Sequence, residues 1–402
     1  MDFTGERYYK LNRILLLCLG LWPYQDSGLK KIQIIFFETL FTSFLLCQLN
    51  AFLVIKCDIE IILKISMYVV INFIYIIKYN AYFLLADNIK HIFDRIRFDW
   101  NILKTQAELD IIRRYADNAK LSTICFMLLV TVAILTLLIT SCIPCIFDII
   151  MPMNDSRPRR LPILVEYYFI DEEVHFYIIL THIIVTMYAG CVTIAAIATL
   201  LIAYALHTCA MFKITSYRME HICDENVQQI PKDLKQHVFY EKLIHAVHLH
   251  RRALDLATIL TNNFAIFYFV LLAFGVSSAI LSVVNFVNIV FLDDVESLIF
   301  FGILFIHLYY IFLGNYVGQN IIDTSTDIHQ TIYNTQWYTA PLWIQKSILL
   351  IIRRSSKKSA LIAGGGLFNA SLEGFAMVRQ IILPKNVLIS MPQEKKYIYY
   401  SL

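Results

Sequence analysis

Few residues in this chain have the types and spacing that chemistry requires. His250 precedes Asp255 in the segment His-Arg-Arg-Ala-Leu-Asp, a spacing at which a histidine can serve as the general base of an acyl transfer. A six-residue match is common by chance, and no companion motif accompanies it. The GxxxxGK, HExxH and GxSxG patterns are also missing from the sequence. We therefore predict no catalytic residues and keep acyl transfer as a remote alternative.

Histidines and cysteines suggest metal binding at two places. His245, His248 and His250 are close in sequence, but on a helix only His245 and His248 share a face. Cys142 and Cys145 have the spacing of a redox pair or a metal-binding knuckle, yet they end an apolar run and no second pair follows. The nine cysteines are scattered and odd in number. We predict no metal, no cofactor and no disulfide framework.

Ionisable residues within apolar runs are functional candidates by default. Six occupy such positions: Glu38, Lys64, Lys78, His175, His182 and His307. We expect the two lysines to extend their ammonium groups to the nearer membrane interface, and Glu38 to behave in the same way. The pattern Gly314-Asn-Tyr-Val-Gly318 indicates a close contact between helices.

The composition decides the class of protein that holds these residues. Hydrophobic residues make up 58% of the 402 positions, charged residues 16%, and the mean hydropathy is +0.61. Soluble domains are usually about 45–50% apolar and about 25% charged. The excess apolar surface needs membrane lipid to cover it. A net charge of +3 without a dense Lys/Arg tract gives no nucleic-acid surface. We predict an all-α, polytopic membrane protein.

A helix needs about 20 mostly apolar residues to cross a bilayer. Six stretches qualify: Ile32–Ile55, Ile59–Ala86, Leu121–Phe147, Val174–Leu206, Phe264–Leu292 and Ser297–Gly318. A seventh region is broken, because apolar Ile344–Ile352 is followed by the polar residues 353–358 and then by Leu361–Leu383 around three glycines. Glycine permits the positive φ of a helix stop. We predict a short helix, a glycine hinge at 364–366 and a seventh span from Leu367.

Lysine and arginine alternate between the loops and predict the orientation. The successive loops carry 5, 1, 7, 3, 7, 0 and 5 of them, beginning with residues 1–31. The heavy loops belong in the cytoplasm, so the N-terminus is inside and the C-terminus is outside. No cleavage site follows the apolar run at Ile14–Trp22, so we expect a cytoplasmic segment at the interface. Asn154 begins a glycosylation sequon in an outer loop.

This topology divides the chain into seven predicted segments. They are a cytoplasmic N-terminal segment (1–31), spans one to four (32–206), a cytoplasmic loop with a helical extension (207–263), spans five and six (264–318), a cytoplasmic loop with a short anchor helix (319–363), the hinge and last helix (364–391) and a tail (392–402).

Several motifs together resemble the insect odorant receptors, most closely those of ants and bees. The resemblance covers nearly the whole chain, and its pieces agree in order, spacing and inside-N topology. They are Leu19–Tyr24, Val247–Leu254, Gly314-Asn315, Trp337-Tyr338, Leu349–Ser355, Ala363–Gly365 and Ser371–Ala376.

The resemblance implies a tuning subunit of an odorant-gated cation channel in the plasma membrane of an olfactory neuron's dendrite. Such subunits assemble with a shared co-receptor subunit, and the last helix of each lines one pore. The inner ends of spans four to seven form a cytoplasmic anchor. A related gustatory-type receptor channel is the alternative, but its Thr-Tyr-x-x-x-x-x-Gln-Phe ending is missing here.

The resemblance also implies a pocket for a small volatile or lipid-like odorant in the outer half of the bundle, between spans two, three, four and six. The candidate ligand-binding residues are Tyr68, Asn72, Tyr75, Leu138, Ser141, Tyr177, Thr181, Tyr188, Phe301, Phe305 and Leu308.

The end of the chain departs from the family pattern. After Val378 the family's last helix continues to its gate, whereas here Pro384 interrupts the sequence and a basic tail follows. No gate residue can be transferred to this chain. We expect that a short final coding segment after Arg379 is missing from this sequence, although a genuine kinked variant is the alternative.

Overall fold

The computed structural model describes residues 5–54, 58–151, 161–167, 170–172, 174–223, 232–289 and 294–383. The glycosylation candidate Asn154 and the tail from Pro384 onward lie outside these residues. The helices are α1 (Glu6–Cys18), α2 (Gly28–Val54), α3 (Ile59–Leu84), α4 (Ala86–Ile102), α5 (Gln106–Ile150), α6 (Phe176–Glu220), α8 (Lys232–Ile289), α9 (Asp294–Asn334), α10 (Leu342–Ser355) and α11 (Leu372–Ile382). The short elements are η1 (His221–Cys223), η2 (Trp337–Thr339), β1 (Ile362–Ala363), η3 (Gly364–Gly366) and β2 (Phe368–Asn369).

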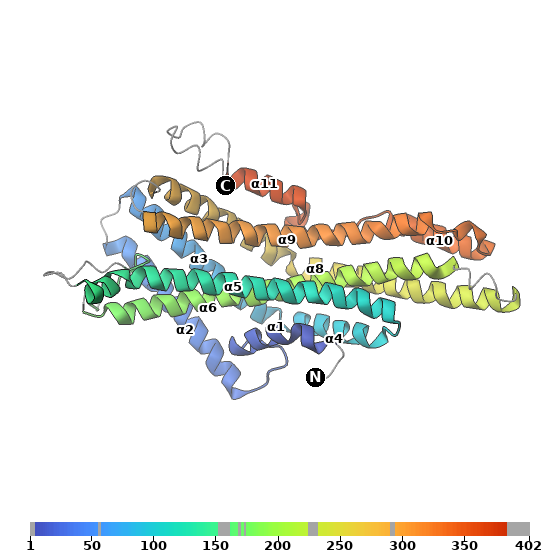
Figure 1. The fold of residues 1–402 in the computed structure, drawn as a ribbon, viewed down its shortest axis with the longest axis horizontal. Helices are drawn as coiled ribbons and strands as arrows, with labels where there is room; N and C mark the ends of the chain where they lie inside the picture. The colour runs from blue at the N-terminus through green and yellow to red at the C-terminus, as the bar shows by residue number, and fades with distance from the viewer. Residues whose placement is uncertain are drawn as a thin grey trace.

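Six of these helices, α2, α3, α5, α6, α8 and α9, are long and apolar enough to cross a membrane. Each of the six stretches predicted from the sequence coincides with the apolar part of one of them. The chain is therefore a multi-pass helical membrane protein, as predicted. Figure 1 shows the long helices running side by side along the longest axis of the molecule.

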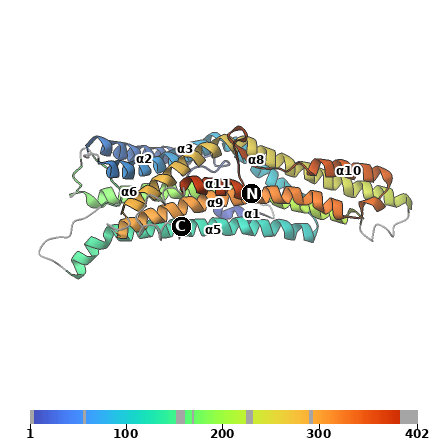
Figure 2. The ribbon, with the colours of Figure 1, turned by 90° about the horizontal axis from the view of Figure 1, so that it is seen from above.

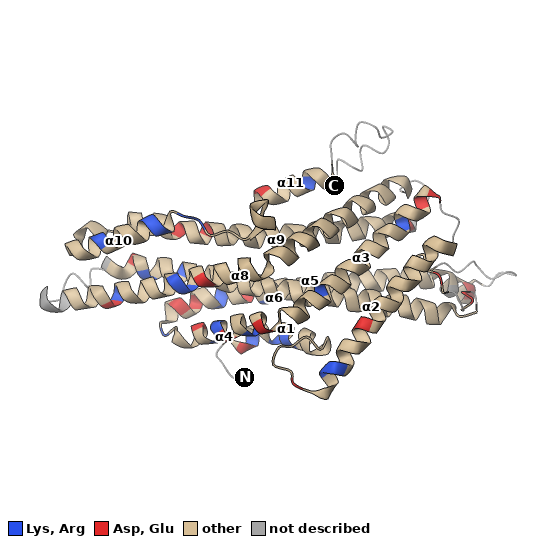
Figure 3. Cartoon of the chain, turned by 180° about the vertical axis from the view of Figure 1, so that it is seen from behind, with Lys and Arg blue, Asp and Glu red and all other residues tan. Residues whose placement is uncertain are grey.

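Four helices are much longer than a bilayer requires. The 58 residues of α8 correspond to about 87 Å at 1.5 Å per residue, roughly three times the 30 Å of a hydrocarbon core. The excess lies at one end, where α8, α9 and α10 extend beyond the other helices (Figure 1). In Figure 3 the coloured Lys, Arg, Asp and Glu positions are denser in this half of the molecule, although α2 and α3 carry some in the other half. We call this half the polar end.

The core is organised around α6. Of its apolar stretch 83% is buried, against 44% or less in the other spans. Viewed from above, α2 and α3 lie along one side and α5 along the other, with α6 and α9 between them (Figure 2). Small side chains let neighbouring helices approach. At Gly190 a Cβ atom would lie 2.2 Å from the ring of Tyr75 on α3, so only glycine permits this packing.

The N-terminal segment is built into the same core. The ring of Tyr8 stacks on Trp100 at 5.5 Å between centroids, and Asn12 Nδ2 donates to Thr199 Oγ1 at 2.9 Å. After α1, Gly20 reverses the chain with φ of +70°. The hydroxyl of Tyr79 donates to the carbonyl oxygen of Leu19 at 2.8 Å and fixes this turn.

A buried ionic cluster joins α4, α6 and α8 at the polar end. The carboxylate of Asp99 accepts from Arg252 Nε at 2.7 Å and lies 3.1 Å from His207 Nε2. The Asp99 side chain has no exposed surface. Because a buried charge is tolerated only when it is paired and hydrogen-bonded, this cluster fixes how the three helices meet.

The last helix begins later than predicted. We expected it from Leu367, but α11 starts at Leu372, because β2 pairs antiparallel with β1 and holds Phe368 and Asn369 in an extended conformation. The two strands are also the exception to the all-α prediction among the described residues. The hinge between them is as predicted, since Gly364, Gly365 and Gly366 all have positive φ.

The chain after the hinge is attached to α9. Ser371 accepts from the amide of Gly374 at 3.0 Å and caps α11, while Asn315 Oδ1 accepts from the amide of Ser371 at 3.1 Å. The other short helix, α10, buries Ile344, Ile348 and Ile351 and exposes Leu342, Leu349 and Leu350 on its surface.

The first prediction concerns the ionic cluster. Asp99→Ala should lower the free energy of unfolding by about 3–5 kcal/mol, because Arg252 and His207 would lose their buried partner. Asp255→Ala is the matched control, since Asp255 also pairs with an arginine, Arg95 at 3.4 Å, but is 61% exposed; its removal should cost about 0–1 kcal/mol. Thermal unfolding of the purified protein in detergent measures both changes, and equal shifts would contradict the assignment.

Candidate functional site

A cavity of about 390 Å³ opens among α3, α5, α6, α8 and α9. Its walls are almost entirely apolar, with Phe126 and Ile134 from α5 facing Met187 from α6. The polar groups come mainly from α3 and α9 and include Lys78 and Tyr310. We call this space the bundle cavity. Its size and its apolar lining with few polar groups are those of sites for small organic molecules.

The structure brings three of the eleven predicted ligand-binding residues to this cavity. Tyr68 and Tyr75 reach it from α3, and Phe301 reaches it from α9. The other eight line neither this cavity nor the second one described below: Asn72, Leu138, Ser141, Tyr177, Thr181, Tyr188, Phe305 and Leu308.

Those eight residues have other environments. Asn72 is buried against α2, where its Nδ2 donates to the carbonyl oxygen of Phe41, and Ser141 donates to its own helix at Leu137. Leu138 is half-buried, and Leu308 packs beside the residues of α8 and α9 that support α11. The remaining four are exposed on the outside of the bundle: Tyr177, Thr181, Tyr188 and Phe305.

The polar centre of the cavity is a contact between α3 and α9. Lys78 Nζ donates to the hydroxyl of Tyr310 at 2.6 Å and lies 4.5 Å from the centroid of that ring. Lys78 is 3% exposed, so our expectation that it extends to the interface was wrong. His307, one turn before Tyr310, donates from Nδ1 to the carbonyl oxygen of Ile303 at 2.7 Å.

Lys64, the other lysine of α3, was also expected to extend its ammonium group to the nearer membrane interface. Lys64 lies near the start of the helix, 2.9 Å from Glu296 and 3.3 Å from Glu60. Its side chain is 15% exposed. Lys64 is therefore paired with carboxylates near the first turn of its span.

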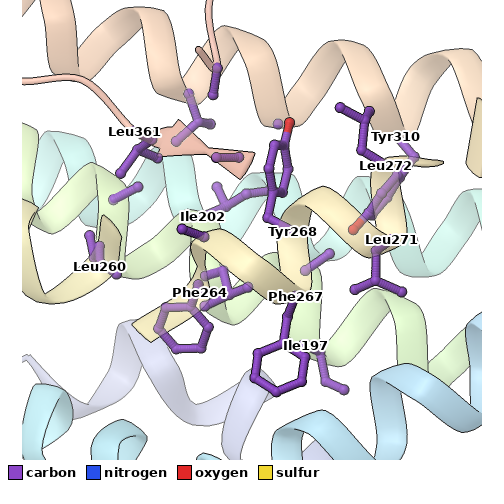
Figure 4. Close-up of a pocket in the computed structure, with 18 of the residues that line it drawn as sticks. Ile197, Ile202, Leu260, Phe264, Phe267, Tyr268, Leu271, Leu272, Tyr310 and Leu361 are labelled. Carbon is purple, nitrogen blue, oxygen red and sulfur yellow. The ribbon is translucent and has the colours of Figure 1, made fainter. Parts of the chain in front are cut away.

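A second cavity of about 170 Å³ lies beside the first, towards the polar end. It is lined by Phe264 and Tyr268 of α8 and by Leu361, Ile362 and Ala363 at the hinge. Figure 4 shows Tyr268 and Leu361 on opposite sides of it, from different parts of the chain. We call it the hinge cavity.

The two cavities share part of their walls. Lys78, Leu271, Gly275, His307 and Tyr310 line both. A molecule in the bundle cavity would therefore touch the same side chains that face the hinge cavity. Since the interior is close-packed and transmits small displacements, this arrangement connects the bundle cavity to the segment that leads into α11.

The packing around the hinge is tight. A Cβ atom on Gly364 would lie 2.6 Å from the ring of Phe269, and Phe368 lies with its ring centroid 6.3 Å from that of Tyr268. A Cβ atom on Gly318 would lie 2.3 Å from the carbonyl oxygen of Ala370. Gly314–Gly318 was predicted to mark a contact between helices, but Gly318 packs on Ala370, which lies between β2 and α11 and belongs to no helix.

The pair His250 and Asp255 forms no catalytic site. His250 is buried against Phe212, and burial together with the charge of Arg354 lowers the pKa of His250 to about 4. Asp255 faces away to Arg95 on the surface. No group of three or more metal-ligating side chains occurs in the part of the chain that the structure describes.

Comparison with known proteins identifies the family. A family model described as the 7tm odorant receptor matches residues 58–382, which is most of the chain. The chain belongs to the insect odorant receptor family. The family is one of receptors rather than of enzymes.

Individual relatives of the receptor are distant. Odorant receptor 22c of Drosophila melanogaster is 22% identical over 224 residues, which cover 54% of this chain and 50% of the fly protein. The chain thus spans about half the length of this curated relative.

The fold resembles the insect olfactory receptor OR5 from Machilis hrabei, with a TM-score of 0.78 and 13% identity over 96% of this chain and 98% of that one. The complex of OR5 with eugenol gives a TM-score of 0.76 and 11% identity over 98% of both chains.

The second prediction tests the hinge packing. In a helix, Gly→Ala is normally stabilising by about 0.5–1 kcal/mol, but Gly318→Ala should lower the unfolding temperature because its methyl group meets the Ala370 carbonyl. Gly275→Ala is the control, since a Cβ atom there meets nothing within 4 Å. Thermal unfolding of the purified receptor compares the two variants. An unfolding temperature of Gly318→Ala that equals or exceeds that of Gly275→Ala would refute the packing.

Proposed function

We propose that the chain is the tuning subunit of an odorant-gated cation channel, assembled with a co-receptor subunit in the dendritic plasma membrane of an olfactory neuron. A small, mostly apolar odorant occupies the bundle cavity. Tyr68, Tyr75 and Phe301 contact it, and Lys78, His307 and Tyr310 join them. The similar Machilis receptor has been solved with eugenol, a small aromatic compound, which supports a ligand of this class.

The observation that carries the proposal is the shared wall of the two cavities. An odorant beside Tyr310 and Gly275 is separated from the hinge by the 170 Å³ space that these residues also line. The hinge is followed by β2 and then by α11, and the residue before α11, Ser371, is attached to α9 through Asn315. A shift of α9 against α8 on odorant binding would therefore move α11, which is the helix that the family's pattern assigns to the pore.

The proposal places the polar end in the cytoplasm. The charge-rich extensions of α6, α8 and α9 and the helix α10 meet there, with the carbonyl oxygen of Ile352 on α10 3.1 Å from His329 Nδ1 on α9. Such an assembly of helices outside the lipid is suited to hold subunits together as an anchor.

The third prediction follows from this orientation. An epitope tag before Met1 should be reached by antibody only after the cells are permeabilised, because the loops rich in Lys and Arg stay inside. Asn154 should carry a glycan that Asn154→Gln removes, visible as a mobility shift. Staining of the tag on intact cells would overturn the orientation without affecting the fold.

The fourth prediction tests the bundle cavity. Gly302 lines it, and a Cβ atom there meets nothing within 4 Å, so Gly302→Leu should fill part of the space without a backbone clash. In cells co-expressing the co-receptor, the odorant concentration for half-maximal current should rise by about tenfold or more. Surface expression should be unchanged.

The control for this experiment lies on the same helix. Phe305 is 51% exposed on the outside of the bundle, so Phe305→Leu should leave the concentration dependence within about twofold of wild type. If both variants behave alike, odorants do not use the bundle cavity. If no member of a broad odorant panel evokes a current with the co-receptor, even from a version whose last helix continues in the family's pattern after Val378, the proposed channel function itself fails.

A further inference from the structure

Among the residues that the structure describes, Lys78 is the one lysine or arginine that lines the bundle cavity. Its side chain is 3% exposed and also borders the hinge cavity. An ammonium group offers three hydrogen-bond donors. Within the described residues Lys78 uses one of them, on the neutral hydroxyl of Tyr310. The remaining donors are available at the surface of an otherwise apolar space.

A comparison along α3 shows what Lys78 lacks. Lys64, on the same helix, is paired with the carboxylates of Glu60 and Glu296. Around Lys78 no Asp or Glu lines either cavity in the described part of the chain. Burying a charge without an opposite charge is costly. The described walls therefore supply the Lys78 amino group with no acidic partner, and a ligand can bring one.

We propose that the bundle cavity selects ligands that carry a carboxylate on an apolar chain. This inference rests on the proposed odorant site and specifies its ligand class. The carboxylate lies against the Lys78 ammonium in a charge-assisted hydrogen bond, the strong class of such bonds in a dry site. The Tyr310 oxygen accepts a hydrogen bond from Lys78, and the Tyr310 hydroxyl can donate a hydrogen bond to the same carboxylate.

The rest of the cavity suits the apolar part of such a molecule. Ile71, Ile134 and Met187 line the space away from the ammonium group. A methyl ester or an alcohol of equal chain length keeps this apolar contact but brings no negative charge to Lys78. The charge of the ligand head group, rather than its length, is therefore what the site distinguishes.

The test is direct binding to the purified receptor in lipid nanodiscs. Tritiated decanoic acid is the probe, and empty nanodiscs give the background. Unlabelled decanoic acid, methyl decanoate and decanol compete for the site. We expect saturable binding, with decanoic acid competing at least about tenfold better than the ester or the alcohol, as a charge-assisted hydrogen bond implies. Unlabelled palmitic acid is also tested as a competitor. Stronger competition by palmitic acid than by decanoic acid indicates a membrane fatty acid as the ligand, and the reverse order indicates a smaller, volatile acid.

Two lysine variants test whether the preference for acid over ester depends on Lys78. Lys78→Met should reduce the preference for acid over ester to about twofold or less while the affinity for the ester stays near wild type, because only the charge contact is lost. Lys64→Met is the matched control on the same helix, and it should keep the preference. The comparison of acid with ester in the wild-type receptor needs no variant and decides the proposal even if Lys78→Met does not fold.

The outcomes are distinct from those of the channel proposal. Absence of saturable binding to the wild-type receptor, equal competition by acid and ester, or a full acid preference in Lys78→Met would each overturn the acid site. Acid binding without current in the presence of the co-receptor would leave the site standing and count against the channel function. Currents evoked by esters and not by acids would support the channel and reject the acid site.

Discussion

The ring of Tyr75 lies against α6 at Gly190, where no side chain larger than a hydrogen atom fits. Contacts of this kind are what can hold helices together in lipid, because the bilayer supplies no hydrophobic driving force between them. They recur along α6, where alanines such as Ala195, Ala196 and Ala203 are buried. Since α6 touches α3, α5, α8 and α9, its small side chains determine how closely these four helices approach and where space remains between them.

The space that remains is not evenly distributed. α3 and α9 contribute large rings, Tyr75 and Tyr310, while α8 and α9 contribute the glycines Gly275 and Gly302. Rings and glycines cannot fill a common volume completely, and the bundle cavity results. The buried amino group of Lys78 at its edge, with a tyrosine as its partner, makes this space chemically different from a packing defect, which would be apolar throughout.

The sequence predicted the six spans, the short helix near 344–352 and the glycine hinge, because each depends on local composition or on the conformational freedom of glycine. Of the side chains that line the bundle cavity, the sequence pointed to Tyr68, Tyr75 and Phe301. Rotation of a helix about its axis is poorly encoded when most of the helix is apolar, so Tyr177 on α6 and Phe305 on α9 were chosen although they face outward. The environment of Lys78 depends on Tyr310, which is 232 residues away, and no local pattern announces it. The delayed start of α11 likewise depends on a two-residue strand pairing that follows from the hinge geometry rather than from hydropathy.

The length of α8 and α9 has a consequence for association. The leucines Leu342, Leu349 and Leu350 on α10 are exposed at the polar end, beyond the six apolar spans. Apolar groups that meet in water gain the hydrophobic effect, whereas apolar groups that meet within lipid do not. A contact made through α10 would therefore strengthen on warming from low temperature and would be insensitive to bilayer thickness or lipid saturation. Contacts between the spans would change with bilayer thickness and lipid saturation. The polar end and the spans of one receptor therefore associate through different physical forces.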